Sequence, residues 1–252
     1  MKIIISPAKG MREDTEYPKF QNMPVFLQQT NKILEYIKAL SYEDLKKLLA
    51  CNDAIARLNY DRFQTMDLHN NLSAALLTYD GIQYKYMAPN VFEDKYFEYV
   101  QKHLRILSGF YGILKPLDGI VPYRLEMQAK FKTPFCNNLY DYWMDSIYSE
   151  LVSSEVAAAL PVEILNLASD EYSKVISKYL TDKVKFVTVS FGEIENGKVK
   201  EKGVYVKMAR GEMVRYMAEN NIENIGDIKS FDRLGYSYNH KLSTNEKYVF
   251  IK

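Results

Sequence analysis

The sequence is poor in the residues that build metal and disulfide sites. Its 252 residues include two cysteines and three histidines, and these are scattered without a CxxC, HExxH or paired Cys/His spacing. Zinc sites and disulfide frameworks depend on such spacings. We therefore expect no metal and no cofactor, and we interpret Cys51 and Cys136 as small core residues.

Long apolar runs and a strong net charge are also absent. The apolar run at residues 1–5 is too short for a signal peptide, and no run is long enough to cross a membrane. We therefore expect a cytoplasmic protein with no membrane partner. The formal net charge of +1 argues against a protein that is basic over its whole surface.

Three glycine-rich fingerprints of common enzymes are missing as well. The chain has no GxxxxGK[ST], GxGxxG or GxSxG sequence, which argues against familiar nucleotide-dependent and hydrolase-type enzymes. The 47% hydrophobic and 26% charged residues are ordinary values for a globular protein, so a sizeable core can form.

Positive charge is concentrated in two stretches. Residues 101–132 contain six Lys and Arg against two Asp and Glu, and residues 183–215 contain eight against four. A basic cleft would be assembled from these stretches. The alternative is that these lysines are simply solvated on turns and hairpins.

The pattern of elements predicts one mixed α/β (α+β) domain over residues 1–252, with a mixed central sheet flanked by helices. We expect it to be a monomer. The Asn-Gly pair at residues 196–197 is a strong hairpin signal. Strands are predicted at residues 1–5, 74–78, 162–167, 184–194, 199–207, 235–238 and 248–251. Helices are predicted at residues 24–40, 45–49, 53–63, 91–103 and 138–151, with two more beginning near residues 168 and 208.

The stretch LRILSGFYGILKPLDGIVPYRLEM, residues 104–127, combines glycine and proline turns with an aromatic, a cation and a carboxylate. Glycines let another backbone or an anion come close, so we interpret this stretch as one wall of a functional cleft. Residues 107–112 also resemble the hairpin of a helix-hairpin-helix element, in which glycine amides approach a DNA phosphate. That interpretation fails if residues 104–107 form a strand.

Several cations lie where anions would bind. Lys207, Arg210 and Arg215 are predicted near the start of a helix, where free N–H groups and the helix dipole favour anions. Lys9 follows the first strand, at an end where ligands collect in open sheets. The alternative for Lys9 is an ordinary surface lysine after a proline turn.

Polar side chains at the ends of elements are candidates for catalysis. If they converge, cations would hold an anionic substrate while a carboxylate served as general acid or base. The catalytic candidates are Asp141, Glu126, Glu171 and Asn166. Further polar candidates at the ends of elements are Ser6, Lys9 and Asp80. Helix capping alone would also explain Asp141 and Glu171.

Seven segments, in order along the chain, resemble the YaaA family of peroxide stress proteins. They are residues 5–9, 79–81, 104–116, 122–127, 139–143, 167–172 and 209–215. The resemblance implies a cytoplasmic bacterial protein that limits oxidative DNA damage and lowers free intracellular iron. It also implies binding of double-stranded or structurally distorted DNA through a basic cleft and a helix-hairpin-helix-like element.

Carried onto this sequence, the resemblance gives a set of DNA-contacting candidates. The side chains are Lys9, Arg105, Lys115, Arg124, Lys207, Arg210 and Arg215, and the backbone contacts are Ser108, Gly109 and Gly112. Three positions depart from the family pattern, namely Asp170 for Asn, Lys115 for Arg and Met208 for Gly. Lys115 keeps the charge but loses the bidentate guanidinium fork.

Two functions are consistent with these patterns. DNA binding is favoured, with the cations on phosphates and tyrosines such as Tyr111 and Tyr123 stacking on bases. The alternative is an enzyme that acts on an anionic or nucleotide-like small substrate in the same cleft. A long open groove would favour DNA, whereas an enclosed pocket would favour catalysis.

Overall fold

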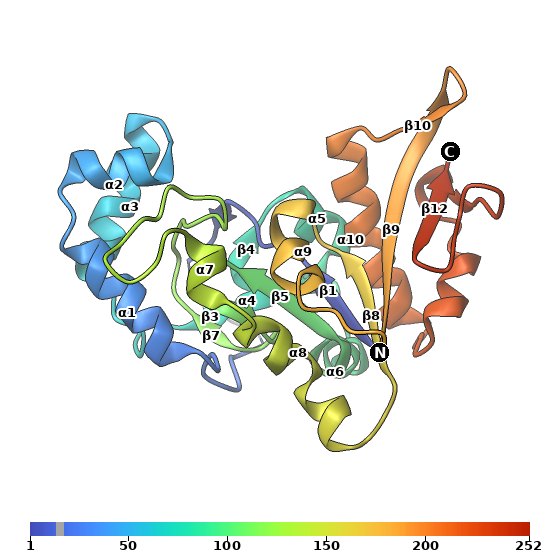
Figure 1. Cartoon of the computed structure of the whole chain (residues 1–252), viewed down its shortest axis with the longest axis horizontal. Coiled ribbons are helices and arrows are strands. Elements are labelled where there is room, and N and C mark those ends of the chain that lie inside the picture. Colours follow the sequence, from blue (N-terminus) through green and yellow to red (C-terminus); the bar gives the residue numbers. More distant parts are fainter. Residues whose placement is uncertain (14–17) are drawn as a thin grey trace.

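A mixed β-sheet forms the centre of the computed structural model, which describes residues 1–13 and 18–252 (Figure 1). Within these residues the strand order is β11-β12-β9-β8-β1-β5-β6, and β10 pairs with β9 off this path. The strands are β1 (Lys2–Ile5), β5 (Leu104–Ser108), β6 (Gly112–Leu114), β8 (Val162–Leu167), β9 (Val184–Glu195), β10 (Lys198–Lys200), β11 (Ser237–Tyr238) and β12 (Lys247–Ile251).

Strand β1 lies inside the sheet because its side chains are apolar on both faces. Ile3, Ile4 and Ile5 are fully buried, and β1 pairs in parallel with both β5 and β8. A β-branched run without alternation is typical of a parallel strand covered on both sides. The carboxyl ends of β1 and β8 therefore open at the same edge of the sheet.

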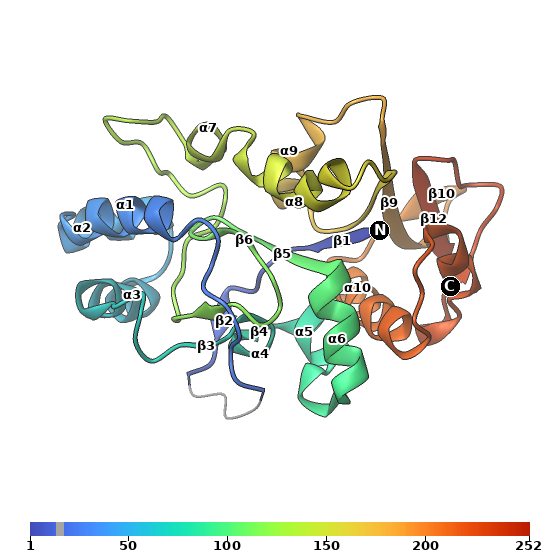
Figure 2. The same cartoon turned by 90° about the horizontal axis from the view of Figure 1, so that it is seen from below.

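Helices cover both faces of the sheet. Figure 2 shows α5 (Ile82–Met87), α6 (Asp94–His103) and α10 (Gly203–Glu219) below it, and α7 (Leu139–Trp143), α8 (Ser146–Ala157) and α9 (Asp170–Ser177) above it. Helices α5 and α10 pack so closely that a Cβ atom at Gly211 would collide with the carbonyl oxygen of Gln83. Glycine at this position lets the two backbones touch.

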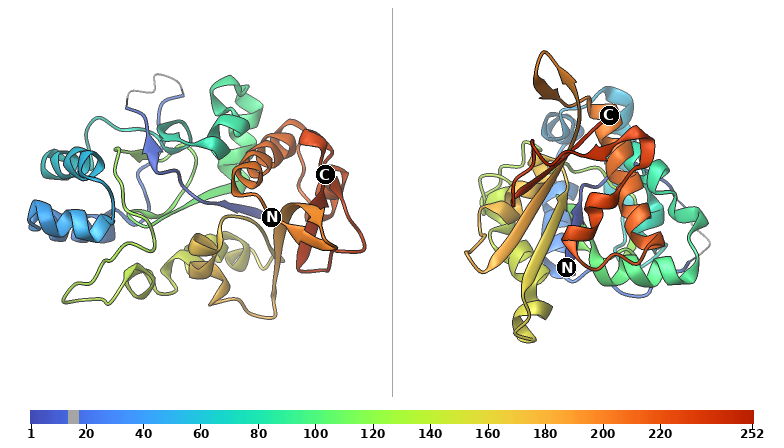
Figure 3. Two further views of the ribbon diagram at one scale, coloured as in Figure 1. Left: turned by 90° about the horizontal axis from the view of Figure 1, so that it is seen from above. Right: turned by 90° about the vertical axis from the view of Figure 1, so that its right-hand side faces the viewer.

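A helical lobe lies at the end of the molecule far from the carboxyl terminus (Figure 1). It contains α1 (Leu27–Lys38), α2 (Tyr42–Leu49) and α3 (Asp53–Thr65). Ser41 caps α2 by accepting a hydrogen bond from the Asp44 N–H at 3.2 Å, which confirms the predicted helix start. At the opposite end, the hairpin of β9 and β10 extends beyond the other strands of the sheet (Figure 3).

The remaining elements of the described residues are short. They are β2 (Gly10–Met11), β3 (Ser73–Ala74), α4 (Ala75–Thr78), β4 (Tyr79–Asp80), β7 (Gly119–Ile120), and the 3-10 helices η1 (Pro89–Val91), η2 (Ile225–Ser230) and η3 (Arg233–Gly235). Strand β2 pairs with β4, which brings the loop after β1 against the segment before α5.

The prediction of a mixed α/β fold with a helix-flanked central sheet is confirmed, but three predicted elements are wrong. Residues 74–78 are mostly the helical turn α4 instead of a strand, because a short buried apolar run fits either form. Residues 138–151 are two helices, separated where Met144 adopts a φ of 46°. The strand predicted at residues 199–207 ends at Lys200, and α10 already begins at Gly203.

The helix-hairpin-helix interpretation of residues 107–112 is also wrong. The segment before the hairpin is strand β5, and the hairpin leads back into β6, which pairs with β5 in antiparallel register. Leu107 lies opposite Ile113, and Ser108 lies opposite Gly112. The glycine-containing segment is therefore a β-hairpin within the central sheet.

Candidate functional site

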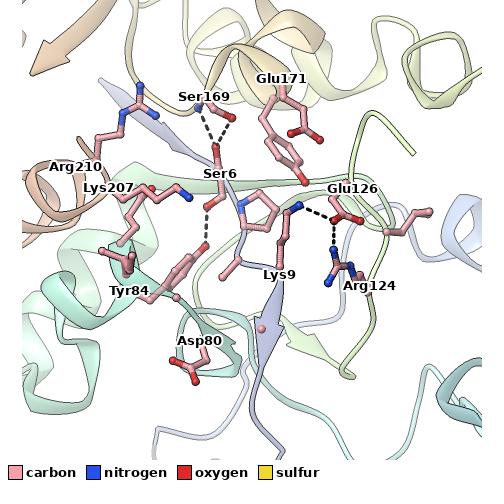
Figure 4. Close-up of a pocket in the computed structure, with 18 of the residues that line it drawn as sticks. Ser6, Lys9, Asp80, Tyr84, Arg124, Glu126, Ser169, Glu171, Lys207 and Arg210 are labelled. Carbon is pink, nitrogen blue, oxygen red and sulfur yellow. Dashed lines mark hydrogen bonds and ion pairs between the residues drawn. The ribbon is translucent and has the colours of Figure 1, made fainter. Parts of the chain in front are cut away.

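A cavity of about 370 Å³ opens at the carboxyl end of β1 (Figure 4). Ligands in open α/β sheets collect at this edge, just beyond the carboxyl ends of the strands. Five segments form its walls: residues 6–10 after β1, 80–84 around the start of α5, 123–126, 169–172 at the start of α9, and Lys207 and Arg210 on α10.

Ser6 holds three of these segments together. Its Oγ accepts a hydrogen bond from the Ser169 N–H at 2.9 Å and lies 3.2 Å from the Ser169 Oγ. Its carbonyl oxygen accepts a hydrogen bond from the Tyr84 hydroxyl at 3.0 Å. Although Ser169 occupies the cap position of α9, its side chain makes no cap hydrogen bond and instead contacts Ser6.

Lys9, Arg124 and Glu126 form an ion cluster on one wall. One oxygen of Glu126, Oε1, lies 3.1 Å from the Lys9 Nζ and accepts a hydrogen bond from the Arg124 Nη2 at 2.8 Å. The Lys9 side chain is 69% exposed, whereas those of Arg124 and Glu126 are 15% and 16% exposed. Two atoms of this cluster, Glu126 Oε2 and Arg124 Nε, are buried without a hydrogen-bond partner.

Arg210 and Lys207 form a second cationic wall on α10. Among the described residues, Arg210 has no ion-pair or hydrogen-bond partner. Burial lowers the pKa of its guanidinium, and the charges of Glu201 and Asp170 only partly oppose this. Lys207 is exposed, lies one turn earlier on the same helix, and points toward Ser6 in Figure 4.

Three tyrosines, Tyr84, Tyr123 and Tyr172, line the pocket. Burial raises the pKa of Tyr123 to about 12 and raises the pKa of Tyr84 well above its usual range, so both are neutral phenols. The Tyr123 hydroxyl lies 2.7 Å from the Tyr79 hydroxyl and 2.5 Å from the Ser108 Oγ. These buried hydroxyl contacts hold the Tyr123 ring in place in the pocket lining.

Carboxylates complete the lining. Asp80 pairs with Arg12 at 3.4 Å and with Lys85 at 3.6 Å. Glu171 Oε1 accepts a hydrogen bond from the Gln128 N–H at 3.2 Å. The pocket therefore contains both signs of charge instead of a purely basic surface.

Unpaired buried polar atoms concentrate at this pocket. Seven buried side-chain nitrogen or oxygen atoms lack a hydrogen-bond partner within the described part of the chain. Four of them belong to residues that line the pocket: Gln83 Nε2, Arg124 Nε, Glu126 Oε2 and Arg210 Nε. Buried polar groups are normally paired, so this concentration of unpaired atoms makes the pocket the strongest candidate site among the described residues.

The pocket brings together part of each set of predicted site residues. From the DNA-contacting set it gathers Lys9, Arg124, Lys207 and Arg210. From the enzyme set it gathers Ser6, Asp80, Glu126 and Glu171. The two sets thus meet in one site.

Three predicted cations lie elsewhere. Arg105 and Lys115 line a separate cavity of about 240 Å³ with Asp118 and Glu150. Arg215 Nε donates a hydrogen bond to Glu219 at 2.7 Å and does not line the pocket. The helix-start interpretation of the α10 cations is wrong, because the helix begins at Gly203.

Two catalytic candidates also lie outside the pocket. Asp141 is exposed in the first turn of α7, where Asn138 caps the helix by accepting from the Asp141 N–H at 2.9 Å. Asn166 is buried at the end of β8, and its side chain contacts Thr188 Oγ1 at 3.3 Å and the Ala168 N–H at 2.9 Å. Both side chains are explained by local structure.

The predicted backbone contacts, Ser108, Gly109 and Gly112, are buried. The Gly109 carbonyl accepts a hydrogen bond from the Trp143 indole at 3.0 Å, and a Cβ at this glycine would lie 2.5 Å from the Leu125 carbonyl oxygen. These glycines accommodate other parts of the protein. Tyr111 is 1% exposed and Tyr123 is 4% exposed, so their predicted stacking on bases is wrong.

Sequence reasoning missed Gln83, Tyr84 and Tyr172. Each lies close to a predicted site segment, and nothing in its own identity distinguishes a site residue from a core residue. The useful signal is positional, since Gln83 and Tyr84 lie shortly after the strand predicted at residues 74–78, and Tyr172 lies shortly after the one predicted at residues 162–167.

In the part of the chain that the structure describes, no three His, Cys, Asp or Glu side chains are grouped so that they could hold a metal ion. A search of the same residues finds no helix that is both long and apolar enough to span a membrane.

Comparison with known proteins gives matches along the whole chain. A family model described as peroxide stress protein YaaA matches residues 1–242. A UPF0246 protein of Desulfitobacterium hafniense is 61% identical over 252 residues, which cover 100% of this chain and 98% of that protein. A UPF0246 protein of Agathobacter rectalis is 54% identical over 250 residues, covering 99% and 98% of the two chains. One of Ligilactobacillus salivarius is 47% identical over the full length of both.

Proposed function

This chain belongs to the peroxide stress protein YaaA family, and from that premise we propose that it protects DNA during peroxide stress by binding it at the pocket. The proposal includes the expectations that it acts as a cytoplasmic monomer, limits oxidative DNA damage and lowers free intracellular iron without chelating it directly. Lys207, Arg210, Lys9 and Arg124 would supply the contacts to phosphate.

The observation that carries the proposal is the unpaired guanidinium of Arg210. Its Nε is buried without a hydrogen-bond partner, and the charges of Glu201 and Asp170 only partly offset the free-energy cost of burying the guanidinium. A bound phosphate would supply an anion in direct contact with Arg210, and guanidinium is well suited to phosphate. Lys207 lies three residues earlier, on the same side of α10, so both cations can face one phosphate.

DNA affinity as a function of salt concentration tests this proposal. The wild type is compared with Lys207→Ala/Arg210→Ala by titrating a fluorescent duplex at several salt concentrations. Each lost phosphate contact reduces the slope of log K against log salt by about 0.9, so the double variant should lose about two units. Arg215→Ala is the matched control, because Arg215 lies on the same helix but pairs with Glu219.

Two results would contradict DNA binding at this pocket. One is the absence of salt-dependent binding by the wild type. The other is a slope that stays unchanged in the double variant.

The size of the pocket favours a second candidate, an enzyme that acts on an anionic or nucleotide-like small substrate. A cavity of about 370 Å³ lies within the usual range for small-molecule sites. Glu126 or Glu171 would serve as general acid or base opposite the α10 cations. Incubation of the protein with a panel of nucleoside phosphates, followed by phosphorus NMR, tests this candidate. Turnover that is lost in Glu126→Gln or Glu171→Gln would support it.

A further inference from the structure

We propose that the pocket binds one nucleoside monophosphate unit, with the phosphate at Lys207 and Arg210 and the edge of the base at Arg124 and Glu126. The unit is either a free nucleotide or a single nucleotide of a DNA strand. This inference rests on the proposed function, because it concerns the same pocket and specifies what enters it.

The two ends of the pocket have different chemistry. In Figure 4, Lys207 and Arg210 lie on one side of Ser6, whereas Lys9, Arg124 and Glu126 lie on the other. At the first end, Lys207 and Arg210 form no ion pair among the described residues, although the charges of Glu201 and Asp170 act on Arg210 without direct contact. At the second end the charges already neutralise one another in part, through contacts of 2.8 and 3.1 Å to Glu126 Oε1. A ligand that satisfies both ends needs a strong anion at one end and neutral hydrogen-bonding groups at the other.

The anion end suits a phosphate. The Arg210 guanidinium offers several N–H donors in a plane, which match the oxygens of a phosphate, and Lys207 adds a mobile charge. Gln83 also lines the pocket, and its buried Nε2 lacks a hydrogen-bond partner. The Arg210 guanidinium, the Lys207 ammonium and Gln83 Nε2 can only donate hydrogen bonds. They therefore favour a ligand group with several acceptor oxygens over a single carbonyl or hydroxyl.

The opposite end suits the edge of a nucleobase. Arg124 uses Nη2 and Glu126 uses Oε1 for their mutual contact, which leaves Arg124 Nε as a donor and Glu126 Oε2 as an acceptor, both unpaired. Each free atom belongs to the same planar group as an atom of the 2.8 Å contact. Bases present an N–H donor beside an acceptor on their pairing edges, and proteins read an unpaired base through that edge.

Apolar side chains also line the pocket. Pro7 and Ile82 are half-buried members of this lining, and they offer apolar contact to the flat surface of a base. A volume of about 370 Å³ has room for one nucleotide but not for a base pair within a helix. DNA would therefore present a nucleotide that is unpaired or turned out of the duplex, and this costs least where the duplex is already distorted.

Calorimetric titration of the full chain tests the inference. The probes are the four deoxynucleoside monophosphates, the corresponding nucleosides and deoxyribose 5-phosphate. We expect the monophosphates to bind at least about tenfold more tightly than either the nucleosides or deoxyribose 5-phosphate, because each of these lacks one set of contacts.

Two variants separate the two ends. Arg210→Ala should weaken the monophosphates and deoxyribose 5-phosphate by about tenfold but leave the nucleosides unchanged. Glu126→Gln should weaken the monophosphates and nucleosides but leave deoxyribose 5-phosphate unchanged. In Glu126→Gln the amide oxygen keeps Arg124, so an NH₂ donor replaces the free acceptor. Arg215→Ala is the control for both, and circular dichroism verifies that each variant is folded.

The source of the nucleotide is distinguished with a duplex that contains 2-aminopurine opposite a mismatch. A rise in its fluorescence on binding, absent in Glu126→Gln, indicates a nucleotide taken from DNA. Binding of free monophosphates without this rise indicates a free nucleotide.

The inference is overturned if the wild type binds deoxyribose 5-phosphate as tightly as the monophosphates, or binds none of the probes. Because this comparison uses only the wild type, it does not depend on the folding of any variant. If deoxyribose 5-phosphate binds as tightly as the monophosphates but DNA binding is salt-dependent and needs Arg210, the proposed function stays intact. Binding of free monophosphates without DNA binding would contradict the proposed function and retain the nucleotide site.

Discussion

The hydroxyl oxygens of Ser6 and Ser169 lie 3.2 Å apart, although 163 residues separate them along the chain. The two serines follow the adjacent parallel strands β1 and β8, whose residues Ile5 and Leu167 are paired. The contact therefore closes the edge of the sheet at which the pocket opens. It also fixes the start of α9 relative to the loop that contains Lys9.

Replacing Ser6 by alanine tests the strength of this closure. Ser6→Ala removes the acceptor of the Ser169 N–H, and we expect the free energy of unfolding to fall by about 1 kcal/mol. Urea denaturation followed by circular dichroism measures the change. Ser153→Ala is the control, since Ser153 is exposed and contacts only the Glu150 carbonyl of its own helix. Equal effects of the two substitutions would contradict the assigned role of Ser6.

Gly109 is expected to be intolerant of any side chain. A Cβ at this position would lie 2.5 Å from the Leu125 carbonyl oxygen and 3.0 Å from the Glu126 carbonyl carbon. We expect Gly109→Ala to lower the free energy of unfolding by about 1–3 kcal/mol through overpacking. In Gly226→Ala the added methyl group meets no atom within 4 Å, so a change within about 0.5 kcal/mol is expected. A neutral Gly109→Ala would mean that the segment of residues 123–126 can move away.

Trp143 is the one tryptophan in the sequence, and it contacts the hairpin between β5 and β6 that contains Gly109. Its indole N–H donates to the Gly109 carbonyl at 3.0 Å, and the side chain is buried. Trp143→Phe leaves that carbonyl without this donor, so we expect a loss of about 1–3 kcal/mol. Thermal denaturation measures it, with Phe26→Leu as a control that alters the packing beside Trp143 but keeps the hydrogen bond. A loss in the control as large as that in Trp143→Phe would assign the effect to packing.

Asp118 should make stability depend on pH. Burial raises its pKa to about 6, although the Lys115 N–H donates a hydrogen bond to its carboxylate at 2.8 Å. Because the pKa is higher in the folded state than in the unfolded state, the folded state binds more protons between about pH 4 and pH 6. The contribution of Asp118 to stability is therefore complete below about pH 4 and is lost as the pH rises through about 6.

Asp118→Asn removes this dependence while keeping an acceptor for the Lys115 N–H. We expect the variant to gain stability relative to the wild type as the pH rises from about 4 to 7, by about 2 kcal/mol. Urea denaturation at several pH values measures the difference. Asp182→Asn, at an exposed position, should run parallel to the wild type. A constant difference between Asp118→Asn and the wild type would contradict the assignment.

The sequence was most informative where one local signal acted alone. The β-branched run of β1 and the Asn196-Gly197 hairpin were predicted correctly, because nearby residues determine both. The end of β10 and the break at Met144 were missed. Tertiary packing decides these boundaries, and the residues themselves have no strong turn signal.

The scatter of the predicted cations has a similar cause. Arg105 pairs in register with Ile4, one residue before the end of β1, so its position alone does not bring it to the pocket edge. Strand β6 then reverses direction after the hairpin and carries Lys115 away from that edge. Charge counting along residues 101–132 cannot detect this reversal. Arg124 reaches the pocket because the chain returns to the edge after β7.

The contact between the backbones of α5 and α10 at Gly211 has a kinetic consequence. Arg210 adjoins this glycine, and Gln83 and Tyr84 lie on the helix that it touches. At Gly211 no side chain separates the two helices, so sliding by one residue would bring a side chain against the Gln83 carbonyl. We therefore expect these two walls to be held in place before a ligand arrives. Association at this wall should then follow a single exponential whose rate rises linearly with ligand concentration, without the plateau that a preceding opening step would impose.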